Sequence, residues 1–217
     1  GGNNGSNGSG TNTNLLTAQN ANIDMHASPG KDHERRDPVL RPVPAGEKRD
    51  GKTVHKMTMD VQELDREIAP GLDVKAWTFN GSYMGPVLHG KLGDVFEITL
   101  ENNGSMGHSL DFHAGMVSPD NTMKTIAPGE KLTYRFEATG SGIWLYHCST
   151  APMSLHMAAG MYGAVIIDPP DLEPVDREYV MVQNETYLTD TEQTAADGNK
   201  LAEVSSESEE TSASLLP

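Results

Sequence analysis

The chain has 217 residues, of which 36% are hydrophobic, and a formal net charge of −15 at pH 7. This length allows one large domain or two small ones. The acidic charge argues against binding to nucleic acid, whose phosphates are contacted by Lys and Arg, and it favours solubility. A single cysteine excludes an internal disulfide framework and a cysteine-rich zinc site. No stretch approaches the roughly 20 apolar residues of a membrane-spanning helix.

Residues 1–51 open with a run of Gly, Ser and Asn and continue through charged, proline-containing sequence. Such a composition cannot bury enough apolar surface to offset chain entropy, so it predicts a flexible linker. Linkers of this kind commonly hang a domain from a membrane anchor or from a preceding domain. His26 and His33 lie within it, and we do not expect either to bind a metal. Because the chain starts at Gly1 without a visible signal peptide, we interpret it as a processed or incomplete product.

Residues 52–170 contain short alternating segments that predict β-strands. Turn signals, such as the Asn-Gly pair at 80–81 and the Pro-Gly pair at 128–129, separate these segments. The predicted strands are residues 54–62, 74–79, 87–91, 95–101, 131–137, 142–146 and 162–168. Many short strands without a long helix indicate an all-β sandwich, and this length is enough for one sandwich core. The Pro-Pro pair at 169–170 ends the domain.

Residues 171–217 predict a linker and the start of something new. Residues 177–183 alternate in the manner of a strand, and a short helix is expected near residues 199–204. The remainder is acidic and rich in Ser and Thr. The strand either adds to the sandwich or begins a second domain that this chain does not finish, and we favour the second interpretation.

A metal-ligand pattern surrounds the only cysteine. Cys148 is followed eight residues later by His156 and five residues further by Met161. Mononuclear copper electron-transfer sites use two His, one Cys and a weak axial Met. Since neighbours in a strand point to opposite faces, His147 cannot join Cys148, and His108 is the predicted second histidine.

Other interpretations of this pattern are less favoured. A lone cysteine is commonly a small buried hydrophobic residue. Met153 and Met157 lie in the same loop, and we interpret them as packing residues because Met161 has the spacing of an axial ligand.

Two histidines remain, and each is tied in sequence to a residue of the first site. His113 follows His108 by five residues, and His147 precedes Cys148. They predict a second copper with nitrogen-rich coordination and a position open for substrate; the alternative is two surface histidines. Asp111 lies between His108 and His113, where an acid beside an open metal site can deliver protons, although an Asp in a loop is also a common local cap.

Five segments together carry a resemblance that covers residues 54–188. They are WTFNG at 77–81, HSLDFHA at 108–114, PGE at 128–130, LYHCSTAPM at 145–153 and GMYG at 160–163. They resemble copper-containing nitrite reductases, and the seven residues between the Cys and the second His resemble the branch that includes outer-membrane enzymes of Gram-negative pathogens. The resemblance implies a cupredoxin-like Greek-key β-sandwich, two such domains per subunit, a homotrimer and an exported bacterial protein, periplasmic or at the cell surface, with the linker as a candidate membrane tether.

The resemblance also implies a role for each candidate residue. The implied type 1 copper ligands are His108, Cys148, His156 and Met161; two of the three type 2 copper ligands are His113 and His147; and the proton-donating carboxylate is Asp111. The implied reaction is reduction of nitrite to nitric oxide with one electron and two protons. A small redox protein of the cupredoxin or cytochrome c type would deliver the electron to the type 1 copper, from which it would pass through Cys148 and His147.

One departure from the family bears on how complete the site is. In the family, the third type 2 histidine and a second active-site histidine come from the second domain, but no histidine follows His156 here. We therefore expect the chain to be a truncated piece of such an enzyme. Two alternatives stay open: a laccase-like multicopper oxidase, although the chain has no His-x-His motif, and a blue-copper electron-transfer module without catalysis.

Overall fold

The computed structural model describes residues 15–16, 24, 26–30, 33–115 and 124–205. The described elements are β1 (Leu15–Leu16), β2 (Glu47–Arg49), β3 (Lys52–Ala69), β4 (Leu72–Phe79), β5 (Leu88–Lys91), β6 (Val95–Asn102), β7 (Asp111–Phe112), β8 (Lys131–Glu137), β9 (Gly142–His147), α2 (Met153–Ala158), β10 (Tyr162–Asp168), β11 (Leu188–Thr194) and β12 (Lys200–Val204). Each strand predicted between residues 54 and 168 is present. Within the described part of the chain, no helix has the length and apolar character to cross a membrane.

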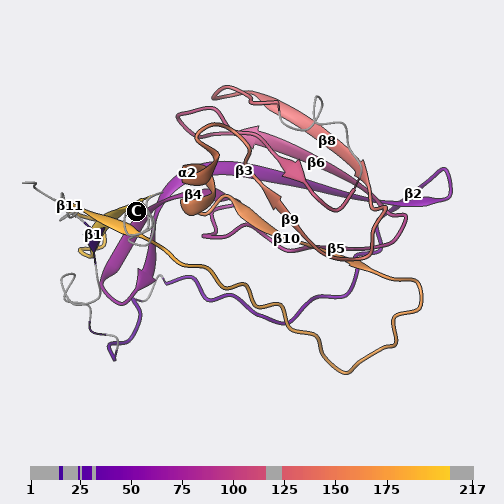
Figure 1. The fold of residues 1–217 in the computed structure, drawn as a ribbon, viewed down its shortest axis with the longest axis horizontal. Coiled ribbons are helices and arrows are strands. Elements are labelled where there is room, and N and C mark those ends of the chain that lie inside the picture. The colour runs from indigo at the N-terminus through magenta and orange to yellow at the C-terminus, as the bar shows by residue number, and fades with distance from the viewer. Residues whose placement is uncertain (1–14, 17–23, 25, 31–32, 116–123, 206–217) are drawn as a thin grey trace, which may run out of the picture.

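The strands form two sheets that pack as a sandwich (Figure 1). The larger sheet has the order β1-β11-β12-β4-β3-β6-β8, with β2 also paired to β3, and the smaller has the order β5-β10-β9-β7. Strand β3 is the long central member of the larger sheet, antiparallel to β4 and parallel to β6. The smaller sheet combines a parallel β10–β5 pair with an antiparallel β10–β9 pair. The predicted all-β sandwich is confirmed.

Aromatic side chains join the two sheets across the core. Phe96 on β6 stacks on Phe136 of β8 with ring centroids 4.9 Å apart, and Phe136 stacks on Phe112 of β7 at 4.7 Å. Phe112 in turn lies 5.7 Å from Tyr146 on β9. All four side chains are buried. Offset or tilted aromatic pairs of this kind add stability beyond the area they bury, and here they connect the core to the ends of β7 and β9.

Two extended segments lie side by side outside the sandwich (Figure 1). Val39 and Tyr179 form an isolated antiparallel bridge, and the Leu40 N–H donates to the Glu178 carbonyl oxygen at 2.9 Å. The Arg36 guanidinium donates to two backbone carbonyl oxygens of residues 84 and 85. The described part of the predicted linker is therefore attached to the sandwich. The strand predicted at residues 177–183 is wrong as a continuous strand, because its pairing is limited to this bridge.

The last two described strands extend the larger sheet. β11 and β12 form an antiparallel pair, and β12 runs parallel to β4 from Lys200 to Ala202. The short helix predicted near residues 199–204 is therefore wrong: the backbone groups of this segment pair with β11 and β4. The domain limits predicted from sequence, 1–51, 52–170 and 171–217, stay a prediction.

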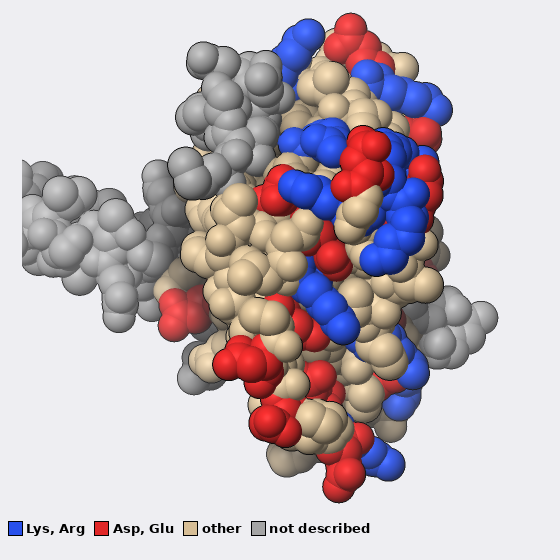
Figure 2. All heavy atoms as spheres, turned by 90° about the vertical axis from the view of Figure 1, so that its right-hand side faces the viewer, with Lys and Arg blue, Asp and Glu red and all other residues tan. Residues whose placement is uncertain are grey.

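Charged side chains of both signs mix at the end of the molecule that carries β2 (Figure 2). Arg49 pairs with Glu97 at 2.7 Å, and Lys56 pairs with Glu47 at 2.7 Å. Figure 1 places this end away from α2. Lys56 and Glu47 are about half exposed, and exposed pairs of this kind contribute little to stability.

Tyr146 provides a test of how closely the core is packed. Its strand partner is Gly163, and a Cβ built on Gly163 overlaps the Tyr146 ring and hydroxyl. The tyrosine hydroxyl donates to the Pro86 carbonyl oxygen at 2.6 Å, so the ring is fixed. We expect Gly163→Ala to lower the free energy of unfolding by about 1–3 kcal/mol, measured by urea denaturation. Ile143→Ala on the exposed side of β9 should change it by less than about 0.5 kcal/mol; equal losses in the two variants would contradict this packing.

Candidate metal centre

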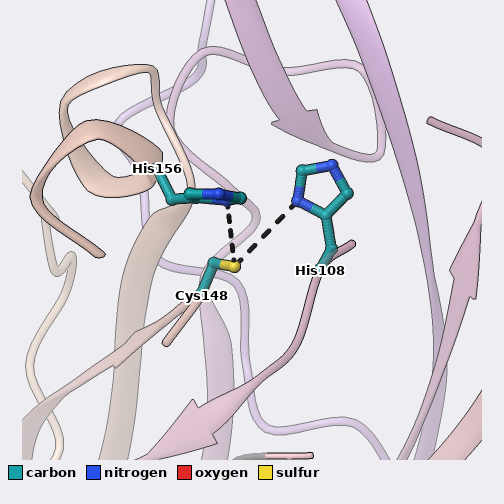
Figure 3. Close-up of side chains that lie close together, drawn as sticks. All are labelled: His108, Cys148 and His156. Carbon is teal, nitrogen blue, oxygen red and sulfur yellow. Dashed lines mark hydrogen bonds between the residues drawn. The ribbon is translucent and has the colours of Figure 1, made fainter. Parts of the chain in front are cut away.

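The first cluster of metal-binding side chains joins His108, Cys148 and His156 (Figure 3). The Cys148 Sγ lies 3.3 Å from His156 Nδ1 and 4.0 Å from His108 Nδ1. All three residues are at least 98% buried. The structure brings His108, and not His147, together with Cys148 and His156, and their three donor atoms converge in a space closed to bulk water.

Three separate parts of the chain hold this cluster together. His108 exchanges two backbone hydrogen bonds with Ile126. Cys148 follows β9, and its N–H donates to the Met161 carbonyl oxygen at 3.0 Å. The Met161 N–H donates to the carbonyl oxygen of His156 at 3.1 Å. The loop from residue 148 to residue 161 is thus closed on itself by its backbone, which fixes where its side chains point.

The three loop methionines that were weighed as axial ligands differ in burial. Met161 is fully buried, Met157 is partly buried, and Met153 at the start of α2 is 45% exposed. The backbone of Met161 is bonded to both Cys148 and His156. Met161 is the most buried of the three, and its role as the axial ligand stays a prediction.

Trp77 of β4 packs against both histidine rings of this first cluster. Its ring centroid lies 4.7 Å from that of His156 and 6.2 Å from that of His108, in edge-on arrangements. The backbone N–H of Trp77 also donates to the carbonyl oxygen of Ala159 at 2.9 Å, directly after α2. Trp77 belongs to the segment WTFNG, one of those that carry the family resemblance. Its indole ring limits how far either imidazole can turn.

Burial keeps both histidines of the first cluster neutral. It lowers the pKa of His108 below its ordinary value, against the opposing effect of Glu63. Burial, and next the nearby His108, lower the pKa of His156 to about 4. A neutral imidazole has one ring nitrogen with a free electron pair, which is the form that binds a metal. The cluster therefore presents its nitrogens ready to coordinate at neutral pH.

The second cluster consists of Asp111, His113 and His147. The two histidine Nε2 atoms lie 3.1 Å apart, and the Asp111 Oδ2 lies 3.3 Å from that of His113 and 3.6 Å from that of His147. The His113 side chain is 46% exposed, whereas that of His147 is 7% exposed. Asp111 and His147 are register partners of β7 and β9, which explains how residues 36 positions apart meet. This cluster, unlike the first, is open to solvent on one side.

The hydrogen bonds of His147 determine its tautomer. Its Nδ1 lies 2.9 Å from the Cys148 carbonyl oxygen, which can only accept, so Nδ1 carries the proton. The electron pair is then on Nε2, the atom that faces His113. Metal-binding histidines commonly use one nitrogen for the metal and the other for a backbone carbonyl. His147 therefore presents the free electron pair of Nε2 to the second cluster.

The remaining histidines in the described residues have other partners. His33 contacts Glu67 at 3.1 Å and His55 contacts Asp94 at 2.7 Å. His89 is buried and bonded at both nitrogens, to the Arg41 carbonyl oxygen and to Asp168. His26 is exposed. Within the described part of the chain, no third histidine joins the second cluster.

Glu63 contacts the first cluster, although no sequence pattern pointed to it. Its Oε1 lies 3.5 Å from His108 Nε2, the ring nitrogen opposite the one that faces Cys148. Burial raises the pKa of Glu63, but hydrogen bonds from Ser105 and His108 outweigh this effect and hold the pKa below its ordinary value. Glu63 lies just beyond the strand predicted at residues 54–62, and its partner His108 is 45 residues away, so no local pattern connects the two.

Residues 60–172 match the family described as multicopper oxidase. The chain belongs to the multicopper oxidase family. A relative named copper-containing nitrite reductase, from Neisseria meningitidis, is 34% identical over 149 residues, or 67% of this chain and 39% of the relative. The structure of the copper nitrite reductase from Nitrosomonas europaea matches with a TM-score of 0.55 at 38% identity, covering 58% of this chain and 47% of that chain. A structure described as a multicopper oxidase matches with a TM-score of 0.58 at 32% identity, covering 74% and 55%.

These similarities confirm the family resemblance and the cupredoxin-like sandwich of this multicopper oxidase chain. The chain spans about two fifths of the length of the curated relatives it matches. The matched residues 60–172 include every member of both clusters.

The buried histidines of this multicopper oxidase chain predict a pH-dependent stability of the metal-free protein. Because the pKa of His156 is about 4 when folded and about 6.5 when unfolded, the unfolded state binds the extra proton between these values. Stability is therefore fully present above pH 6.5 and is lost as pH falls toward 4, by about 3 kcal/mol. Urea denaturation of the metal-free protein at several pH values measures it, and His156→Leu should flatten the slope; an unchanged slope in that variant would contradict the assignment.

Proposed function

We propose that the whole protein to which this chain belongs reduces nitrite to nitric oxide with copper at both clusters. The observation that carries the proposal is that two different donor sets meet through one peptide bond, with Cys148 in the first and His147 in the second. Relatives named copper-containing nitrite reductase support it. When bound, copper at the first cluster would accept one electron at a time, and copper at the second would bind nitrite and reduce it with that electron.

The donor set of the first cluster fits copper that changes oxidation state. A thiolate suits Cu(I), imidazoles suit Cu(II), and a weak thioether completes the set. We assign His108, Cys148, His156 and Met161 as the ligands. Their burial and the packing of Trp77 hold the donors in place, so that the site need not rearrange when the oxidation state changes.

The second cluster fits a metal that binds substrate. His113 and His147 supply two nitrogens, and the exposed side of His113 leaves room for a further ligand. Asp111 holds its carboxylate beside both nitrogens, where it can carry a proton to a bound anion. We propose that the third nitrogen comes from another part of the whole protein, since no histidine follows His156 in these 217 residues.

An oxidase of the laccase type is the second candidate, because a structure described as a multicopper oxidase matches most of the chain. Such enzymes bind a trinuclear copper cluster through paired His-x-His motifs. The 217 residues contain no such motif, which favours nitrite reduction. A blue-copper carrier with the first cluster alone would leave the convergence of Asp111, His113 and His147 without a role.

The remaining parts of the proposal rest on the family resemblance. We propose that a small redox protein supplies the electron, that the whole protein is a homotrimer, and that it acts outside the bacterial cytoplasm.

Loss of the thiolate tests the first cluster. Charge transfer from the Cys148 thiolate to Cu(II) should give the oxidised protein a strong visible absorption band, which Cys148→Ser should abolish. A coloured Cys148→Ser variant would show that the band does not arise from a thiolate–copper bond and would overturn the assignment of the first cluster.

The axial assignment has its own test. Met161→Leu should keep the copper and raise its reduction potential, because a donor that favours Cu(II) has been removed. Met153→Leu is the matched control and should leave the potential unchanged. The opposite result would exchange the roles of the two methionines.

Proton delivery distinguishes an enzyme from a carrier. In the full-length protein, Asp111→Asn keeps the shape but removes the titrating group, so nitrite turnover should fall by about 10²–10⁴-fold. The visible band of the first cluster should stay unchanged.

His147→Ala should remove copper from the second cluster only. The total copper content should therefore fall while the visible absorption band of the first cluster is retained. Full turnover in either variant would rule out the proposed site.

A further inference from the structure

We propose that Glu63 is a positioning residue for His108 and that its negative charge lowers the reduction potential of copper at the first cluster. The inference rests on the proposed function, because it requires copper to bind there. It concerns a side chain on β3, far in sequence from the loop that holds Cys148 and His156.

The two nitrogens of His108 have different partners. Nδ1 faces the Cys148 Sγ, and Nε2 lies 3.5 Å from the Glu63 Oε1. A carboxylate can only accept a hydrogen bond, so the proton of the neutral ring is on Nε2 and the electron pair is on Nδ1. Glu63 thereby selects the tautomer in which His108 can bind a metal beside Cys148. The His108 side chain is fully buried and that of Glu63 is 23% exposed, so water screens this interaction only in part.

The carboxylate itself is held from the other side. Ser105 donates to it twice, from its N–H to Oε1 at 2.9 Å and from its hydroxyl to Oε2 at 2.6 Å. Both oxygens of Glu63 therefore have fixed partners, and one of them also faces His108. The position of the Glu63 carboxylate relative to the imidazole of His108 is therefore fixed.

The loop between β6 and His108 is shaped for this contact. A Cβ built on Gly104 would lie 2.8 Å from Glu63 Oε1 and 3.2 Å from His108 Nε2, so a side chain there would wedge between the two groups. The Asn102 amide donates to the carbonyl oxygens of Met106 at 2.8 Å and Ile126 at 3.0 Å, and its oxygen accepts from the Gly104 N–H at 3.0 Å. The Asn102 side chain thus anchors both ends of the loop that carries Ser105.

The charge has a predictable electronic effect. A carboxylate that accepts the second N–H of a metal-binding imidazole makes that imidazole a stronger donor. A stronger donor and a nearby negative charge both favour Cu(II) over Cu(I), because Cu(II) carries the larger positive charge. Glu63 should therefore lower the potential at which the first cluster accepts an electron. If Glu63 only fastened the Ser105 loop, the potential would not depend on its charge.

Replacement of Glu63 by Gln separates charge from structure. In this variant the side-chain amide oxygen can accept from both Ser105 N–H and His108 Nε2–H, and the side-chain NH₂ group can donate to the Ser105 hydroxyl oxygen. In the copper-loaded chain, Glu63→Gln should shift the Cu(II)/Cu(I) equilibrium about tenfold toward Cu(I), which for one electron raises the potential by about 59 mV. A redox titration followed through the visible absorption band measures it.

Asp65→Asn is the matched control, because it removes the same charge from an exposed position two residues along β3. It should shift the potential by less than a third of the Glu63→Gln value. The unfolding free energy of the metal-free Glu63→Gln variant should stay within about 0.5 kcal/mol of the unsubstituted chain. Equal shifts in the two variants, or none in Glu63→Gln, would overturn the role of Glu63 while leaving the copper site in place. An unsubstituted chain that binds copper without a visible band would instead overturn the proposed function.

Glu63→Leu gives a second measurement. It removes the acceptor for His108 Nε2–H altogether, so Cu(II) affinity should fall by about 10–100-fold and the potential should rise at least as far as in Glu63→Gln. An unchanged Cu(II) affinity in Glu63→Leu would show that the ring of His108 is held without Glu63.

Discussion

The alternation of side chains at the end of β9 is the constraint on which both clusters depend. Cys148 directs its sulfur toward His108 and His156, and His147 directs its ring toward Asp111 and His113. Two neighbouring residues can serve two sites only because extended backbone sends them to opposite sides. The Cys148 carbonyl oxygen adds to this by accepting from His147 Nδ1. The two clusters are therefore joined through a single peptide unit.

The two clusters differ in access to water, and this difference matches the roles proposed for them. The donors of the first are buried and surrounded by Trp77 and the closed loop that ends at Met161. Burial keeps its histidines neutral, which costs stability at low pH but presents free electron pairs to a metal. His113 in the second cluster is half exposed. A site that only exchanges electrons benefits from exclusion of water, whereas a site that turns over an anion needs an entrance.

Support for the first cluster extends well beyond its ligands. Glu63 fixes the outer nitrogen of His108, Ser105 fixes Glu63, and Asn102 fixes the loop that carries Ser105. Each step is a hydrogen bond between groups brought together by the large sheet. The parallel pairing of β3 with β6 makes this possible, since it places residue 63 near the loop that follows β6. A surrounding shell of this kind is what holds metal ligands in one geometry.

Alternation predicted the strands between residues 54 and 168, because it is a local property. The spacing of Cys148, His156 and Met161, together with the family resemblance, predicted the residues that form both clusters. Tertiary structure decided the rest. Residues 177–183 form only a bridge to Val39, and residues 199–204 are a strand rather than a helix because β4 and β11 offer partners. Glu63 reached His108 through the pairing of β3 with β6, which no local pattern predicts. Periodicity indicates which face of a segment is buried, but the partner across the sheet depends on the whole fold.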